Sequence, residues 1–219
     1  MNNIFKKYST IMLFDVETSG LSPFYDEIIE FAGVFITSSG IENEISELIK
    51  LNKHSRLDSK IIELTGITDN DLMRKGISHL EIANKIKDNL KGDVLLIAHN
   101  AQFDIQFLLE LFKETKNTLS NFDVLDTLTI LKDRKEFPHK LSDAIVYYGL
   151  QDLVSNSHRA IDDVKATYAV LLKMDEELAD IDKYINLLGF NPKYSLTTRL
   201  PNVKYVAQPY GSNIKLYNK

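Results

Sequence analysis

The stretch TIMLFDVETSGLSPFYDEIIEFAGVFITSSGIENEISELIKL, residues 10–51, decides the fold. Its first part, TIMLFDVE (10–17), is an apolar run that ends in charge, and it predicts a buried strand. EIIEFAGVFIT (27–37) is rich in β-branched and aromatic residues, and the turn signal SSG separates it from the alternating segment IENEISELIKL (41–51). The three segments therefore predict an antiparallel meander.

Farther along the chain, strands are followed directly by helices. DVLLIAH (93–99) predicts a second buried strand, QFDIQFLLELFKE (102–114) has helical spacing, and FDVLD (122–126) predicts a short strand. Further helices are predicted at 58–64, 69–75, 78–90, 127–134, 140–149 and 158–178. A meander followed by strand–helix units implies an α/β fold, with a mixed five-stranded sheet and helices on both faces. After about residue 189 the apolar residues follow neither the helical nor the strand periodicity.

The composition is that of a soluble globular protein. The chain has 219 residues, 44% hydrophobic and 26% charged, enough for one domain with a small appendage. No apolar run is long enough to cross a bilayer, and the absence of cysteine excludes disulfides and thiolate metal sites. We expect a cytoplasmic location and no contact with a membrane.

The charge is unevenly distributed. The net charge of -5 argues against a protein that coats nucleic acid. From Lys183 onward there are six basic residues, no acidic residue and five of the ten tyrosines, which leaves a net charge of -11 in residues 1–182. We therefore expect a domain at 1–182 and a basic, tyrosine-bearing tail at 183–219. This tail either binds nucleic acid or a partner protein, or packs back on the acidic body.

Asp15 and Glu17 end the first predicted strand, where side chains two residues apart point to the same face. Two adjacent carboxylates repel each other, and a divalent cation with a preference for oxygen ligands, such as Mg²⁺ or Mn²⁺, would relieve that repulsion. A solvated surface pair is the simpler alternative, so this signal alone does not identify a site.

Four more residues lie where strands or loops turn into helices. Asp104 follows the second buried strand, in the region where open α/β sheets bind ligands, although it also suits the positive end of its helix. Asp162 and Asp163 complement the dipole of the helix they begin. His158 adds positive character where the dipole disfavours it, so its functional meaning depends on whether it faces the same site as the acids.

Taken together, DVETSGL (15–21), HNAQFD (99–104) and HRAIDD (158–163) resemble the three motifs of the DEDDh 3′–5′ exonuclease superfamily. The proofreading exonuclease (epsilon) of bacterial DNA polymerase III is the best-known member of that superfamily, which has an RNase H-like fold. ELTGIT (63–68) also resembles a segment between the first and second motifs. The resemblance covers about residues 9–175, with the motifs in order and at ordinary spacing.

The resemblance implies a catalytic site that holds two divalent ions, Mg²⁺ or Mn²⁺. Asp15 would bridge the ions, Glu17 and Asp163 would complete the one on the side of the attacking water, and Asp104 would serve the other. Two such ions activate water and stabilise the leaving oxygen of an anionic phosphodiester. His158, five residues before Asp163, would be the general base, since an ordinary imidazole pKa of about 6.5 suits that role near neutral pH.

The resemblance also implies contacts to the substrate. Thr18 would offer its backbone N–H to the terminal sugar, Leu21 and Phe103 would pack against the last bases, and Asn100 would support the site. Thr65 departs from the pattern, because the polymerase III relative has histidine before the Gly-Ile pair, so a contact from this position to the nucleotide is not implied here.

The sequence leaves three functions open. The first is a 3′–5′ exonuclease acting on a single-stranded or frayed DNA 3′ end, in proofreading or repair, with a DNA polymerase subunit in trans as its partner. The second is an RNA exonuclease of the same superfamily, an oligoribonuclease or an enzyme that trims RNA ends, which would be distinguished by contacts to the 2′-OH. The third is an inactive nuclease-fold binding module, against which the presence of all four acids and the histidine argues.

Overall fold

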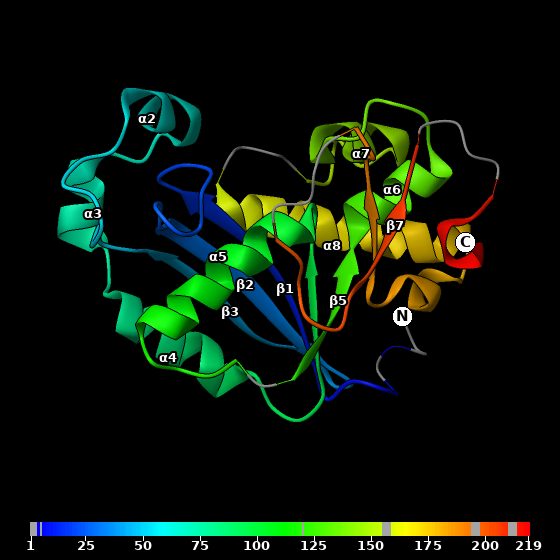
Figure 1. Cartoon of the computed structure of the whole chain (residues 1–219), viewed down its shortest axis with the longest axis horizontal. Helices are drawn as coiled ribbons and strands as arrows, with labels where there is room; N and C mark the ends of the chain where they lie inside the picture. Colours follow the sequence, from blue (N-terminus) through cyan, green and yellow to red (C-terminus); the bar gives the residue numbers. More distant parts are fainter. Residues whose placement is uncertain (1–3, 5, 120, 155–158, 194–197, 210–213) are drawn as a thin grey trace.

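A mixed five-stranded sheet forms the centre of the computed structural model, which describes residues 4, 6–119, 121–154, 159–193, 198–209 and 214–219. The strand order is β3-β2-β1-β4-β5, with β1–β2 and β2–β3 antiparallel and β1–β4 and β4–β5 parallel (Figure 1). The bounds are β1 Thr10–Thr18, β2 Ile28–Thr37, β3 Gly40–Leu48, β4 Val94–Ala98 and β5 Phe122–Asp126. The predicted sheet is confirmed.

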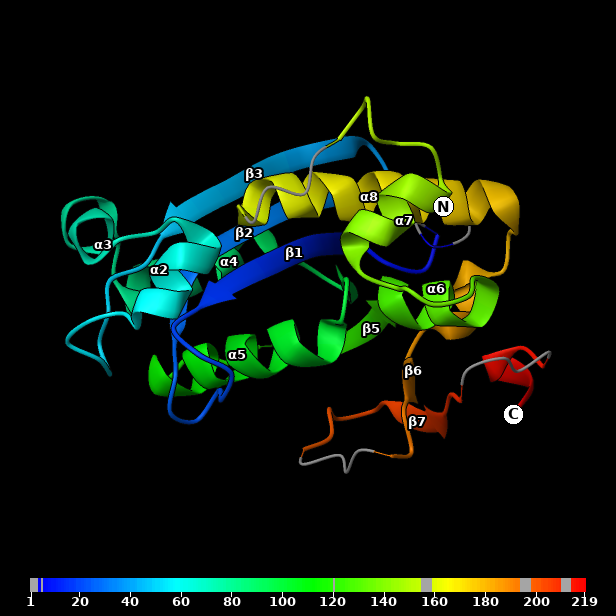
Figure 2. The same ribbon diagram turned by 90° about the horizontal axis from the view of Figure 1, so that it is seen from above.

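Helices cover both faces of the sheet, as predicted (Figures 1 and 2). Their bounds are α2 Ser59–Thr65, α3 Asp69–Lys75, α4 His79–Asn89, α5 Ala101–Glu114, α6 Thr127–Arg134, α7 Leu141–Tyr147 and α8 Ala160–Glu177. Alternation along β1 explains the two layers, because successive side chains point to opposite faces. Ile11 and Leu13 pack in the same cluster as α8, whereas Met12 and Phe14 pack in the cluster of α4 and α5.

The change from antiparallel to parallel pairing at β1 determines where a site can form. β1 pairs with β2 on one side and, in parallel, with β4 on the other, so the carboxyl ends of β1 and β4 meet at one edge of the sheet. Ligands of open α/β sheets bind beyond such strand ends. The residues of the first and second motifs lie at this edge.

The described part of the tail packs on the body. It forms the short strands β6 (Leu187–Phe190) and β7 (Lys204–Ala207), a parallel pair beside β5 and α6 (Figure 2). The single turns η1 (Ile181–Tyr184) and η2 (Leu216–Asn218) flank this pair. These two strands lack a sequence period, because four residues are too few to show one.

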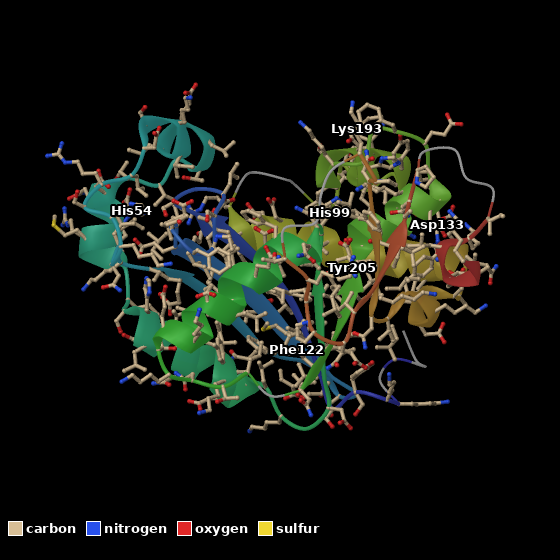
Figure 3. All side chains as sticks on the ribbon, in the orientation of Figure 1. His54, His99, Phe122, Asp133, Lys193 and Tyr205 are labelled. Atoms are coloured by element: carbon tan, nitrogen blue, oxygen red, sulfur yellow. The ribbon has the colours of Figure 1, made fainter. Side chains whose placement is uncertain are left out.

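Tyrosines attach this tail to the body. The hydroxyl of Tyr184 donates to Asp133 at 2.7 Å, that of Tyr217 donates to Asp180 at 2.6 Å, and that of Tyr205 donates to Gln102. Figure 3 shows Asp133 and Tyr205 at the side of the molecule occupied by the tail. Buried leucines of the tail join the two main clusters of the core: Leu187, Leu188, Leu200 and Leu216. These contacts favour the alternative in which the tail packs back on the acidic body.

Among the described residues, no helix combines the length and the apolar character that a bilayer crossing requires.

Candidate active site

Asp15 and Glu17 lie at the carboxyl end of β1, both partly buried. They continue the face of Ile11 and Leu13, which points towards α8. The register of the pairing with β2 shifts between Glu17 and Thr18, the last residue of β1, so the strand is irregular where its acidic end lies. The sequence therefore ends an apolar strand with two acidic side chains on the face that α8 covers.

The third motif brings a further carboxylate to this point. Asp163 lies in the first turn of α8, only 7% exposed, and its carboxylate oxygen lies within 4.8 Å of oxygens of Asp15 and Glu17. Helix α8 packs on β1 and β2. Residues almost 150 positions apart thus form one acidic cluster.

Asp104 completes the acidic site from the opposite layer. It lies in the first turn of α5, is 3% exposed, and its Oδ1 accepts a hydrogen bond from the backbone N–H of Val16 at 3.2 Å. Val16 stands between Asp15 and Glu17, so this bond holds the start of α5 against the end of β1. Among the neighbouring charges, that of Asp104 raises the pKa of Asp15 most, after the effect of burial itself.

The cluster holds more negative charge than its protein surroundings stabilise. Burial raises the pKa of Asp15 well above its ordinary value, and the charges of Asp104, Asp163 and Glu17 raise it further. Burial and then the charge of Asp163 raise the pKa of Glu17 to about 7, and burial raises the pKa of Asp104 to about 8. A hard divalent cation such as Mg²⁺ or Mn²⁺ prefers oxygen donors and supplies the missing positive charge. The donor set therefore fits a divalent metal site.

Glu30 and Arg159 were not singled out from the sequence, yet they adjoin this cluster. Glu30 faces Glu17 across the β1–β2 pairing and its side chain is 1% exposed. The guanidinium of Arg159 donates to Glu30 Oε1 through Nη2 at 2.6 Å and through Nε at 3.1 Å. The backbone N–H of Ala160 donates to Oε2 at 3.3 Å. Glu30 thus caps α8 and orients the helix that carries Asp163. A charged residue inside an otherwise apolar strand was the available signal.

Asp126 plays a similar part for α5. It ends β5, is 5% exposed, and its Oδ1 accepts hydrogen bonds from the backbone N–H groups of Asn100 and Ala101 at 2.9 and 3.1 Å. Asn100 adopts a left-handed conformation (φ 76°) with an exposed side chain at the start of α5. The helix that presents Asp104 is therefore fixed by a carboxylate from the neighbouring strand.

The remaining expected residues lie around the same edge. The hydroxyl of Thr18 donates to the carbonyl of Gly20 at 2.6 Å, and Leu21 is 85% exposed. Phe103 is half-buried, with its ring 5.0 Å from that of Phe107. His158 lies outside the described residues, so its expected role stays a prediction.

Thr65 does not offer a free hydroxyl to a nucleotide. It is 6% exposed, and its Oγ1 donates to the carbonyl of Ile61 at 2.9 Å and accepts from the N–H of Ile67 at 3.1 Å. These contacts hold the turn at the end of α2, which agrees with the departure of this position from the family pattern.

Solved structures support the fold. E. coli Exonuclease I in complex with a dA16 oligonucleotide has a TM-score of 0.70 to this chain at 20% identity, covering 80% of this chain and 42% of that one. A moderately thermophilic Exonuclease I from Methylocaldum szegediense has a TM-score of 0.68 at 20% identity, with coverages of 80% and 42%. The RNase H-like fold is thereby confirmed.

Sequence comparison identifies the family. The DNA polymerase III PolC-type protein of Bacillus cereus is 36% identical over 175 residues, 78% of this chain. That of Staphylococcus epidermidis is 32% identical over 198 residues, 90% of this chain. The chain spans 12% and 13% of the length of these two relatives. Residues 12–171 match the family model described as Exonuclease (RNase_T). The chain therefore belongs to the RNase_T exonuclease family, within the DEDD superfamily that its three motifs resemble.

Proposed function

We propose that the chain is a metal-dependent 3′–5′ exonuclease that hydrolyses DNA from its 3′ end and releases 5′-mononucleotides. The observation that carries this proposal is the meeting of Asp15, Glu17 and Asp163, whose carboxylate oxygens lie within 4.8 Å of one another, with Asp104 beside them. Membership of the exonuclease family supports nuclease chemistry. Exonuclease I, which shares the fold, was solved with a DNA oligonucleotide.

Each side chain of the cluster has a role in this proposal. Asp15, Glu17, Asp104 and Asp163 hold two divalent ions, Mg²⁺ or Mn²⁺. When bound, such ions supply the positive charge that acidifies water and stabilises an anionic phosphodiester during in-line displacement. His158 is the general base that takes the proton of the attacking water, which explains a histidine two residues before the start of α8.

The substrate end is held by residues that surround the carboxylates. The backbone N–H of Thr18 faces the terminal sugar in this proposal, and the exposed Leu21 and the half-buried Phe103 contact the last bases. Asn100 supports the site from the start of α5. Apolar and aromatic contacts tolerate any base sequence, as an exonuclease requires.

The biological role that we propose is proofreading or repair. The relatives with the same exonuclease segment are PolC-type DNA polymerase III proteins, of which this chain matches a small part. A DNA polymerase subunit acting in trans is the partner that follows from this similarity.

The test uses 5′-labelled DNA and RNA strands of one sequence, incubated with the purified protein and Mg²⁺ and resolved on a gel. We expect DNA to shorten stepwise from its 3′ end, excess EDTA to stop the reaction, and a circular single strand to be resistant. Cleavage of the circle at the same rate would overturn the requirement for an end. Preferential degradation of the RNA strand would show that RNA, and not DNA, is the substrate. Inactivity on every strand would favour the inactive binding module.

A further inference from the structure

The loop between β1 and β2, residues 19–27, exposes more apolar surface than a loop requires. Leu21, Phe24 and Tyr25 are 85%, 57% and 78% exposed. Single exposed apolar residues are ordinary on protein surfaces, but three within five positions form a patch of the kind that marks an interaction site. Two of the three are aromatic, and neither aromatic belongs to the proposed site.

The aromatic part of this loop is held in shape by Lys53. Its Nζ donates to the backbone carbonyls of Pro23 at 3.2 Å, Phe24 at 3.4 Å and Asp26 at 2.8 Å. An ion pair of 2.8 Å with Glu114 of α5 fixes the Lys53 side chain in turn. The exposed rings are therefore presented on an ordered backbone, which lowers the entropy that a ligand must overcome on binding.

Internal bonds close the loop at both ends. The carboxylate of Asp26 accepts from the N–H of Ser22 at 2.9 Å, and the N–H of Ser19 donates to the carbonyl of Glu27 at 2.9 Å. Ser19 lies only two residues beyond Glu17 of the acidic cluster. The loop that carries the exposed rings therefore begins directly after the acidic end of β1.

The loop also adjoins a basic segment. The buried carboxylate of Glu27 accepts from the backbone N–H groups of Asn52, Lys53 and His54, which joins the segment to the base of the loop. Figure 3 shows His54 at the end of the molecule that carries α2 and α3. The imidazole Nε2 of His54 lies 3.3 Å from Oδ1 of Asp26, the loop residue that follows Tyr25. Exposed aromatic rings beside the acidic cluster suit a single nucleic-acid strand, since unpaired bases stack on aromatic side chains.

We propose that Phe24 and Tyr25 form a base-stacking platform that binds unpaired nucleotides upstream of the terminal one. This proposal rests on the proposed nuclease function and extends its substrate site beyond the last nucleotide. The occupant is single-stranded DNA, because the loop follows directly on the acidic end of β1 and unpaired bases stack on exposed rings. The platform makes the enzyme prefer strands several nucleotides long.

The test compares KM and kcat for a single-stranded 12-nucleotide DNA and for a dinucleotide. In the double variant Phe24→Ala/Tyr25→Ala, KM for the 12-nucleotide strand should rise roughly tenfold or more, since stacking contributes about that factor for each base. Hydrolysis of the dinucleotide should change less than about twofold, because a dinucleotide does not reach the platform. Tyr25→Phe should retain the wild-type KM, because stacking does not need the hydroxyl.

Ile41→Ala is the matched control, because Ile41 is an apolar residue with 54% exposure beside the β2–β3 turn, at the opposite end of β2 from this loop. It should leave both substrates unaffected. An unchanged KM of the double variant for the 12-nucleotide strand would overturn the platform, and would leave the patch as a candidate surface for a protein partner. An equal loss on both substrates would also overturn it. If the wild type degrades no DNA, the proposed function fails first, and the two failures are thus distinguishable.

Discussion

Removal of the Arg159 side chain tests whether the Glu30–Arg159 pair positions the third motif. In Arg159→Ala the carboxylate of Glu30, 1% exposed, loses the three hydrogen bonds from the guanidinium and keeps the bond of 3.3 Å from the N–H of Ala160. A buried carboxylate without its counter-charge must take up a proton, admit water or move. Each of these responses disturbs the start of α8.

The expected loss in the free energy of unfolding follows from the exposure of Glu30 and Arg159. Breaking a fully buried ion pair costs about 3–5 kcal/mol, and breaking an exposed pair costs about 0–1 kcal/mol. Glu30 is buried but the Arg159 side chain is 50% exposed, so we expect a loss of about 2–3 kcal/mol in the free energy of unfolding. For a chain of this length, that corresponds to a fall of roughly 5–10 °C in Tm.

The assay is thermal unfolding followed by circular dichroism, with exonuclease rates measured at saturating Mn²⁺. Lys165→Ala is the matched control on the same helix. The pair of Lys165 with Glu44 is 3.5 Å long with both side chains about half exposed, so its loss should cost less than about 0.5 kcal/mol. The double variant Glu30→Met/Arg159→Met should recover most of the stability, because an apolar pair leaves no buried charge. It should not recover full activity, because the cap of α8 is absent.

Two outcomes would refute this reasoning. If Arg159→Ala lowers the free energy of unfolding no more than Lys165→Ala, the Glu30–Arg159 pair contributes no more to stability than an exposed ion pair. If Arg159→Ala destabilises the protein but its rate at saturating Mn²⁺ is that of the wild type, the pair stabilises the fold without positioning Asp163.

Three other perturbations test the site itself. His158→Ala should lower kcat by roughly 10²–10⁴, the usual contribution of a general base, while calorimetry still detects Mn²⁺ binding; a variant with half the wild-type rate would make His158 a helix-start residue only. Asp163→Asn should lower turnover by orders of magnitude and Asp162→Asn should not, since adjacent helical side chains diverge by about 100°; the opposite result would shift the motif by one residue. The raised pKa values of Glu17, to about 7, and of Asp104, to about 8, lie above unfolded values near 4, so the metal-free native state binds extra protons. Its stability should therefore decline as the pH rises from about 4 to 8, and Mn²⁺ should raise Tm more at pH 8 than at pH 5.5; an equal shift at both pH values would contradict a carboxylate metal site.

The sequence by itself determined the layers of the protein. Strands β1, β2 and β4 appear as apolar or β-branched runs and α5 appears as a stripe at helical spacing, because these patterns depend only on neighbours within a few positions. The acidic residues of the three motifs were assigned from the sequence through their resemblance to the exonuclease family, since each motif is a short contiguous segment.

Only the tertiary structure decided which distant residues bind the polar side chains at the ends of these helices and strands. Arg159 reaches Glu30 across 129 positions, and Tyr205 reaches Gln102 across 103. Asp126 caps a helix that begins 25 residues before it, and the paired tail strands β6 and β7 place Leu187 and Leu188 in the core clusters of the body. A local pattern records whether a residue prefers burial or a helix. It does not record which distant residue supplies the partner of a buried charge, because that partner is brought into contact only when the sheet and its helices pack together.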